Sequence, residues 1–219
     1  MTAYVLVHGG NMSTDTWNRY TVDEQIHTDD NRMGGRIWDP LVPDIRARGG
    51  QAFAPTLIDE HECHFSDHLD QISDLITGND LRNIVLAGHS YGGMIITAAA
   101  ARHAERVRGM LYVDAALPDP GQSLFDVIAA GGVDPLSVEG LESDAPYVEK
   151  VEFDPSGLTS IPKIYLRCTR SEFAAVTQSA RQRIAAGTAG PNWTYTELPS
   201  WHVPMANMPH QVGALLAAL

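Results

Sequence analysis

The chain has few cysteines, few basic residues and no long apolar run. Its 219 residues include two cysteines, Cys63 and Cys168, which lie far apart in the sequence. Two distant thiols are typical of a reducing compartment rather than of a disulfide-stabilised secreted domain, so we expect a cytoplasmic protein. No apolar run approaches the roughly 20 residues that a membrane helix needs, and the N-terminus lacks the basic segment that opens a secretion signal. We therefore expect no membrane partner.

Basic residues are outnumbered by acidic ones, 15 Lys and Arg against 27 Asp and Glu, which gives a formal net charge of −12. Such a chain repels phosphate groups, so we expect no nucleic-acid partner. With 44% hydrophobic and 19% charged residues, the composition is that of a folded protein rather than a disordered one. The length suits a single domain over residues 1–219. The sequence leaves open whether the chain forms a homodimer.

Short apolar runs alternate with helical patterns, which predicts an α/β fold with a mainly parallel six-stranded sheet flanked by helices. The predicted strands are Ala3–Val7, Gln51–Ala54, Asn83–Ala87, Gly109–Val113, Lys163–Cys168 and Asn192–Glu197. The predicted helices are Ile37–Arg48, Asp67–Thr77, Tyr91–His103, Phe173–Ala186 and Met208–Leu219. Ser66 is the expected N-cap of the helix that starts at Asp67, whose carboxylate suits the positive end of the helix dipole.

Two stretches interrupt this alternation. Residues 11–35 form a polar segment that is too long for a usual connection between a strand and a helix. Residues 117–161 are rich in proline, glycine and acidic residues, with a short helical pattern around Ser123–Ala130. A long segment at the ligand-facing edge of a sheet often acts as a cap or lid, so we expect this role for residues 117–161. For residues 11–35, a functional loop and a solvated surface excursion are equally consistent with the sequence.

The most informative motif is Gly88-His89-Ser90-Tyr91-Gly92-Gly93. It lies between a β-branched run and a run rich in alanine and isoleucine, which predicts a sharp turn from strand to helix. This G-x-S-x-G pattern is typical of a nucleophile elbow, in which the turn presents a serine hydroxyl at the edge of the sheet. The flanking glycines suit such a turn because the two backbones approach too closely for side chains. Ser90 is therefore the candidate nucleophile.

A serine nucleophile needs a base, and His202 is the best candidate. It follows the last predicted strand and precedes the last helix, which places it at the same edge of the sheet as Ser90. Stabilising an oxyanion needs two backbone N–H donors. Tyr91, directly after the serine, supplies one candidate, and Gly10, in the loop after the first strand, supplies the other. His8 is expected to orient this loop rather than to take part in the chemistry.

Three motifs together resemble the α/β-hydrolase superfamily: Val5-Leu6-Val7-His8-Gly9-Gly10, the elbow around Ser90, and His202-Val203-Pro204-Met205 before a terminal helix. The chain is similar to the compact branch that includes plant hydroxynitrile lyases, methyl-ester-cleaving esterases and bacterial hydrolases. The resemblance covers the chain except residues 11–35, which look like an insertion. It implies six of the usual eight strands, a small cap after the strand that ends at Asp114, and no cofactor.

The third member of the catalytic triad departs from the pattern of this branch. The resemblance places Ser171 where relatives usually carry an aspartate, with Glu172 beside it. A serine cannot stabilise an imidazolium as a carboxylate does. Asp114 ends the preceding strand, the position where haloalkane dehalogenases and some lipases carry their acid. We favour Asp114, with Glu172 as the alternative acid and a dyad supported by water as a third arrangement.

Further residues are weaker candidates. The candidate lining of a substrate pocket comprises Asn11, Met12, Trp17, Leu124, Phe125, Ile128 and Trp201. For the two tryptophans, packing in the core is an equally good interpretation. A group of metal-ligating residue types occurs at His61, Glu62, Cys63, His64 and His68. Their spacing matches no zinc signature of established geometry, so we expect no metal site.

These observations predict a serine hydrolase, most similar to carboxylesterases, that acts on a small-molecule acyl substrate such as an ester through a triad and an acyl-enzyme. One alternative is a lyase that resembles the hydroxynitrile lyases. Those enzymes have a lysine beside the histidine, where this chain has Val203. A second alternative is a non-catalytic ligand-binding protein on a hydrolase scaffold, which the serine at position 171 favours. The sequence does not identify the acyl and alcohol groups, because fold does not imply function.

Overall fold

A computed structural model describes residues 1–10, 12–138 and 141–219 of the chain. Its centre is a six-stranded sheet in the order β2-β1-β3-β4-β5-β6, with every neighbouring pair parallel. The strands are β1 (Ala3–Val7), β2 (Gln51–Phe53), β3 (Ile84–His89), β4 (Val107–Val113), β5 (Lys163–Cys168) and β6 (Trp193–Leu198). All six predicted strands are confirmed, and so is the predicted fold class.

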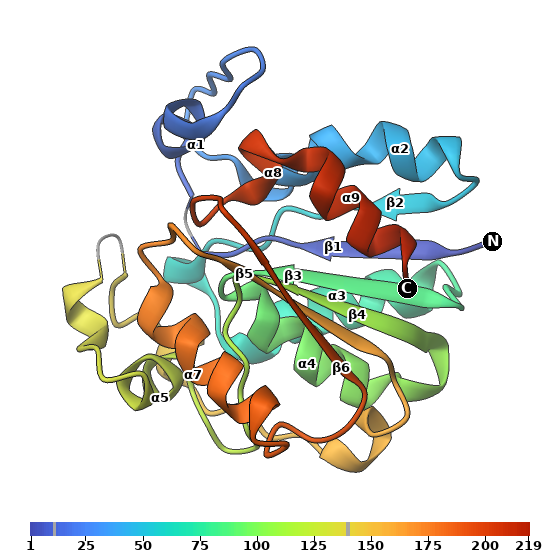
Figure 1. Ribbon diagram of the computed structural model, residues 1–219, viewed down its shortest axis with the longest axis vertical. Coiled ribbons are helices and arrows are strands. Elements are labelled where there is room, and N and C mark those ends of the chain that lie inside the picture. Colours follow the sequence, from blue (N-terminus) through green and yellow to red (C-terminus); the bar gives the residue numbers. More distant parts are fainter. Residues whose placement is uncertain (11, 139–140) are drawn as a thin grey trace.

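Helices cover both faces of the sheet, so its central strands are buried and apolar. One face packs against α3 (Phe65–Gly78), α4 (Gly92–Arg102) and α7 (Ala174–Ala185). The other packs against the 3-10 helix η1 (Gly34–Leu41), α2 (Val42–Ala47), α8 (Pro204–Asn207) and α9 (Pro209–Ala217). Figure 1 shows these two layers, and alternate side chains of each central strand enter the two cores.

Two sequence predictions about helices were wrong in detail. Residues 37–48 form η1 followed by α2 rather than one α-helix. Pro40, which has no N–H to donate and whose ring clashes with the preceding turn, lies inside η1. Helix α3 begins at Phe65, so Ser66 lies inside it and His64 is its N-cap. The N–H of His64 donates to the side chain of Asp67 at 2.8 Å, which stabilises this earlier start.

Residues 12–35 contain a helix that the sequence analysis did not predict. Helix α1 (Thr14–Tyr20) has Ser13 as its N-cap, whose hydroxyl accepts a hydrogen bond from the N–H of Thr16 at 3.0 Å. Ser13 also pairs with Arg32 in an antiparallel bridge, which brings the two ends of residues 12–35 together. We call these residues the excursion. The excursion lies above the carboxyl ends of the strands in Figure 1.

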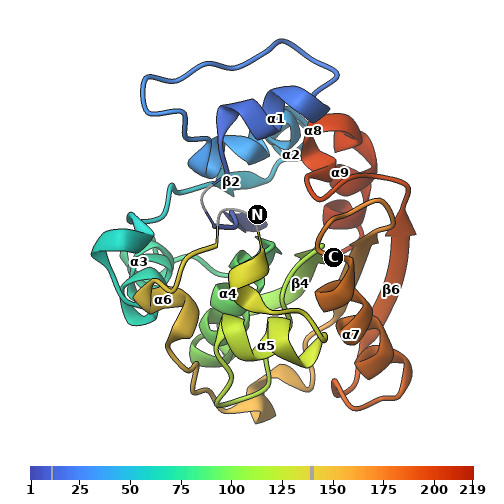
Figure 2. The same ribbon diagram turned by 90° about the vertical axis from the view of Figure 1, so that its left-hand side faces the viewer.

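In residues 117–161, the predicted cap, the described residues form short elements. They are α5 (Leu124–Ala130), the 3-10 helix η4 (Pro135–Ser137), α6 (Ala145–Val148) and the 3-10 helix η5 (Pro155–Leu158). The predicted helical pattern at 123–130 is confirmed as α5, with a capping box between Ser123 and Asp126. In Figure 2, α5 lies in front of α4 and α6 lies beside α3, both opposite α1 and α2.

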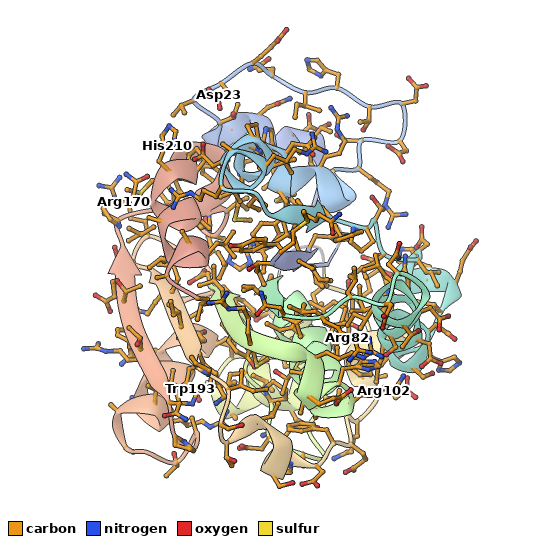
Figure 3. All side chains as sticks on the ribbon, turned by 90° about the vertical axis from the view of Figure 1, so that its right-hand side faces the viewer. Asp23, Arg82, Arg102, Arg170, Trp193 and His210 are labelled. Atoms are coloured by element: carbon orange, nitrogen blue, oxygen red, sulfur yellow. The ribbon has the colours of Figure 1, made fainter. Side chains whose placement is uncertain are left out.

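The C-terminus lies at the end of the sheet where the strands begin. There, Leu219 packs beside Gly109 near the start of β4 (Figure 1). In Figure 3, Asp23 of the excursion and His210 of α9 lie at one end, while Arg102 of α4 and Trp193 of β6 lie at the other. Among the helices that the structure describes, none has the length and apolar character to cross a bilayer.

We predict that Gly93→Ala strongly destabilises the protein. A Cβ at position 93 would lie 2.2 Å from the carbonyl oxygen of Ala116, in the loop after β4. Because backbone atoms on both sides are fixed, we expect a loss of about 3 kcal/mol in the free energy of unfolding. Gly78→Ala is the matched control, since a Cβ at the end of α3 meets nothing within 4 Å. Urea unfolding of both variants measures the difference, and equal stability of Gly93→Ala and wild type would contradict the packing at the elbow.

Candidate active site

The turn around Ser90, which the sequence predicts to be a nucleophile elbow, forms where β3 meets α4. Ser90 has a φ of +54°, a left-handed conformation that is uncommon for a residue with a side chain. Hydrogen bonds hold it there: its N–H donates to the carbonyl of Val113 at 3.3 Å, and its own carbonyl accepts from the N–H groups of Gly93 at 3.1 Å and Ala116 at 3.0 Å. Such a conformation persists only where its surroundings determine it, and it is common at functional sites.

His202 and Asp114 meet at the carboxyl ends of the strands, as Ser90 does. His202 lies in the loop between β6 and α8, and its Nδ1 donates a hydrogen bond to Oδ2 of Asp114 at 2.7 Å. The ring of His202 is partly exposed, whereas the side chain of Asp114 is fully buried. The second carboxylate oxygen, Oδ1, accepts from the N–H of Cys168 at 2.8 Å. Both oxygens of the buried carboxylate are therefore hydrogen-bonded.

The other two residues considered for the acid position lie differently. The hydroxyl of Ser171 is 3.4 Å from Nδ1 of His202 and accepts a hydrogen bond from the N–H of Phe173 at 3.0 Å. Glu172 is exposed and accepts a hydrogen bond from the hydroxyl of Tyr20, in the excursion, at 2.9 Å. The structure thus brings Asp114, rather than Glu172, to the histidine.

His89 packs against the ring of His202 and forms a hydrogen bond with its backbone. Its Nε2 donates a hydrogen bond to the carbonyl of His202 at 2.9 Å, and the two ring centroids are 4.7 Å apart. Burial, together with the neighbouring His202, lowers the pKa of His89 well below its usual value. The low pKa favours the neutral form of His89.

The loop after β1 approaches the elbow closely. A Cβ on Gly9 would lie 2.6 Å from Cβ of Ser90, so only glycine fits there. Gly10 follows it, and Tyr91 is buried at the start of α4. His8 orients the loop as expected: its Nδ1 donates to the carbonyl of Gly9 at 2.6 Å, and its Nε2 accepts from the N–H of Leu57 at 2.9 Å. Tyr91 is thus next to Ser90 in the chain, and Gly10 lies in the loop whose Gly9 packs against Ser90.

The fold agrees with a comparison of the sequence with family models. Residues 4–215 match the model of the alpha/beta hydrolase family. The chain belongs to this family. The match confirms the resemblance that the three motifs carried, and it extends across the excursion and the cap.

Two relatives illustrate how far sequence similarity reaches within the α/β-hydrolase family. A carbendazim hydrolyzing esterase of Nocardioides sp. (strain SG-4G) is 23% identical over 229 residues, covering 85% of this chain and 95% of that protein. A pyrethroid hydrolase of Sphingobium wenxiniae is 33% identical over 105 residues, covering 44% of this chain and 36% of that protein.

Solved structures of other α/β-hydrolases have the same fold. An extracellular α/β-hydrolase from a Paenibacillus species superposes with a TM-score of 0.71 at 18% identity, covering 100% of this chain and 98% of that one. A pyrethroid hydrolase from Sphingobium faniae superposes with a TM-score of 0.69 at 18% identity, covering 100% and 97%. At these identities the similarity shows the fold alone.

The candidate pocket residues lie in different environments. Trp17 is 2% exposed and packs in the core with η1, whereas Trp201 is 37% exposed and stacks on Tyr20 with ring centroids 5.4 Å apart. Met12 packs at the edge of the same core. The cap residues Leu124 and Ile128 are buried in the opposite core, with Phe125 packed against it. Asn11 lies outside the described residues.

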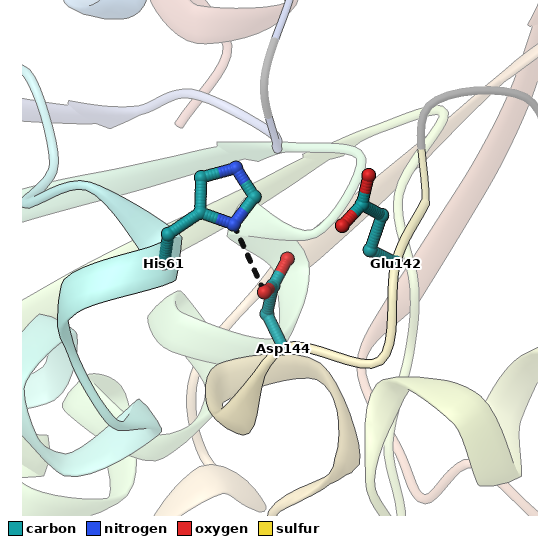
Figure 4. A group of neighbouring side chains, drawn as sticks. All are labelled: His61, Glu142 and Asp144. Carbon is teal, nitrogen blue, oxygen red and sulfur yellow. Dashed lines mark hydrogen bonds and ion pairs between the residues drawn. The ribbon is translucent and has the colours of Figure 1, made fainter.

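The histidines of residues 61–68 point in different directions, and Cys63 stays beside His68, with its Sγ 3.3 Å from Nε2. His68 points inward, where its Nδ1 accepts from the hydroxyl of Tyr91 at 3.0 Å and its Nε2 donates to the carbonyl of Ile58 at 2.9 Å. His61 points outward and donates from Nδ1 to the cap residue Asp144 at 3.0 Å, which raises the pKa of His61. Figure 4 shows this pair with Glu142. The nitrogen and oxygen atoms of these three side chains that could bind a metal ion lie within 4.8 Å of one another.

One buried contact between distant residues was missed in the sequence analysis. Glu60 lies in the 3-10 helix η2 (Glu60–Glu62) and accepts a hydrogen bond at Oε1 from the hydroxyl of the cap residue Tyr147 at 2.9 Å. Its Oε2 accepts from Arg32 of the excursion at 3.1 Å. No local pattern in the sequence marks this contact, because its members lie 87 and 28 positions apart.

We predict that acid destabilises the protein through His8. Burial lowers the pKa of this histidine from 6.5 to about 4. Between these values the unfolded chain binds a proton that the folded protein does not, so the free energy of unfolding falls as the pH falls. From His8 alone we expect a loss of about 2 kcal/mol between pH 7 and pH 5. Urea unfolding at both pH values measures this loss.

Two variants provide the controls for this prediction. His8→Gln removes the titrating group, so its stability should depend less on pH than that of wild type. His210→Gln changes a histidine whose side chain is 88% exposed, and it should follow wild type. An identical loss in wild type and His8→Gln would show that His8 does not carry the effect.

Proposed function

We propose that this protein is a serine hydrolase that cleaves small, neutral esters through an acyl-enzyme, with Ser90 as nucleophile, His202 as base and Asp114 as acid. The observation that carries the proposal is the 2.7 Å hydrogen bond from Nδ1 of His202 to the buried carboxylate of Asp114, at the edge of the sheet where the elbow presents Ser90. This is the order of roles in a Ser-His-Asp triad.

The hydrogen bond determines which nitrogen of His202 can act. With the proton on Nδ1 donated to Asp114, Nε2 is the basic nitrogen and can take the proton of Ser90 as the serine attacks the ester carbonyl. Asp114 then stabilises the imidazolium that forms. Its burial strengthens this interaction, because the charge pair lies in a region of low dielectric constant.

The remaining steps follow from the loops around Ser90. The N–H groups of Gly10 and Tyr91 stabilise the negative oxygen of the tetrahedral intermediate. His202 then returns its proton to the departing alcohol, and the carbonyl carbon stays bonded to Ser90 as an acyl-enzyme. A water that gives its proton to His202 attacks this ester, and the acid is released as Ser90 regains its proton.

The relatives support the ester as the reacting group, since two of them are named as an esterase and a pyrethroid hydrolase. The net charge of −12 disfavours anionic substrates. The non-catalytic alternative depended on the serine at position 171, where a catalytic site would need an acid. The hydrogen bond from His202 to Asp114 argues against it, because Asp114 supplies that carboxylate. The lyase alternative lacks a lysine beside His202, where Val203 is buried.

We predict that Asp114→Asn lowers kcat for p-nitrophenyl acetate hydrolysis by about 10⁴, because an amide neither fixes the tautomer of His202 nor stabilises its charge. Ser90→Ala should abolish the burst of p-nitrophenol that an acyl-enzyme produces. Stopped-flow and steady-state absorbance measurements give both quantities.

Glu172→Gln is the matched control, because it makes the same chemical change at the other candidate acid. It should leave kcat unchanged, since Glu172 contacts Tyr20 rather than His202. A large loss in Glu172→Gln, with normal turnover in Asp114→Asn, would overturn the assignment of the acid. Turnover by Ser90→Ala at the wild-type rate would overturn the proposed mechanism.

A further inference from the structure

The cap residue Tyr147 lies against both candidate oxyanion donors. A Cβ on Gly10 would be 2.5 Å from the hydroxyl oxygen of Tyr147, so the hydroxyl lies directly over the backbone of Gly10. The Tyr147 ring packs edge-on against the ring of Tyr91, with centroids 5.0 Å apart. A substrate carbonyl bound to these two N–H groups would therefore contact Tyr147.

The hydroxyl of Tyr147 is anchored by a buried acid. It donates to Oε1 of Glu60 at 2.9 Å, and Oε2 of Glu60 accepts from Arg32 at 3.1 Å. Glu60 is 6% exposed and Tyr147 is 3% exposed. A charge-assisted hydrogen bond between buried groups is strong and directional. Glu60 therefore fixes Tyr147 in place, so that the ring acts as a rigid wall.

The order of the strands decides which part of an ester meets this wall. Ser90 follows β3, in the middle of the sheet. Asp114 and His202 follow β4 and β6, on one side of it, whereas Gly10 and Glu60 follow β1 and β2, on the other. The departing alcohol must face His202, because the histidine gives it a proton. With the carbonyl oxygen on the N–H groups of Gly10 and Tyr91, the acyl group takes the remaining direction, toward the cap that carries Tyr147.

We propose that Tyr147, held by Glu60, is a specificity-determining residue that restricts the enzyme to esters with short acyl chains. This inference rests on the proposed function. The substrate class is an ester whose acyl part is acetyl or of similar size, with the greater freedom in size on the alcohol side.

The test compares p-nitrophenyl acetate with p-nitrophenyl hexanoate, which share a leaving group and differ in the acyl chain. We expect wild type to have at least about a tenfold higher kcat/KM for the acetate. Tyr147→Ala should reduce this preference at least about tenfold, chiefly by raising kcat/KM for the hexanoate. Tyr147→Phe keeps the ring but loses the hydrogen bond to Glu60, so it should have a preference between those of wild type and Tyr147→Ala.

Val148→Ala is the matched control, because it shortens the next residue of α6, which is 43% exposed, and should leave the preference unchanged. Damage to the fold alone would lower both rates together and leave the ratio intact. If Tyr147→Ala does not fold, Tyr147→Leu tests the same loss of the ring.

The failure of this inference is distinguishable from the failure of the proposed function. If wild type hydrolyses the acetate but the ratio is the same in wild type, Tyr147→Ala and Tyr147→Leu, the inference about Tyr147 is wrong and the hydrolase remains. If wild type hydrolyses neither ester and a fluorophosphonate does not label Ser90, the proposed function fails and the inference falls with it.

Discussion

A fully buried carboxylate is costly unless its oxygens are hydrogen-bonded, and the arrangement of the candidate site depends on how Asp114 meets this condition. One oxygen accepts from the N–H of Cys168 at the end of β5, and the other from Nδ1 of His202. The first bond joins two neighbouring strands, and the second brings the loop after β6 to the same point. His89, directly before Ser90, then holds the backbone of His202. The buried carboxylate, directly or through His202, thus links the carboxyl ends of four strands, β3, β4, β5 and β6.

The excursion and the cap add contacts on both sides of this centre. On the side of β4 to β6, Tyr20 of the excursion stacks on Trp201 and donates to Glu172. On the side of β1 and β2, Arg32 of the excursion binds Glu60, which holds Tyr147 of the cap. The excursion therefore contacts the loops around the site at both ends, and its polar composition suits this task. The apolar cap residues, in contrast, pack into the core over α4.

The sequence predicted the parts of this structure that local chemistry determines. Strand β3, the glycines of the elbow and the position of His202 before the last helix each follow from short patterns, and the fold follows from their order.

Contacts between distant residues were harder to predict. The choice among Asp114, Glu172 and a water at the histidine depends on where two loop backbones lie, which no local pattern encodes. Helix α1 was missed because its sequence is polar and its stability comes from Ser13, Trp17 and the pairing with residue 32. The bond from Tyr147 to Glu60 joins two segments through tertiary structure alone.

The proposed activation of Ser90 by Asp114 and His202 can be tested without knowledge of the substrate. The most direct measurement is the rate at which a fluorophosphonate labels the protein, with the modified residue identified by peptide mass spectrometry. We predict that Ser90 alone is modified, that Asp114→Asn slows labelling severely, and that Glu172→Gln labels as fast as wild type. Absence of labelling in wild type, or equal rates in wild type and Asp114→Asn, would contradict it.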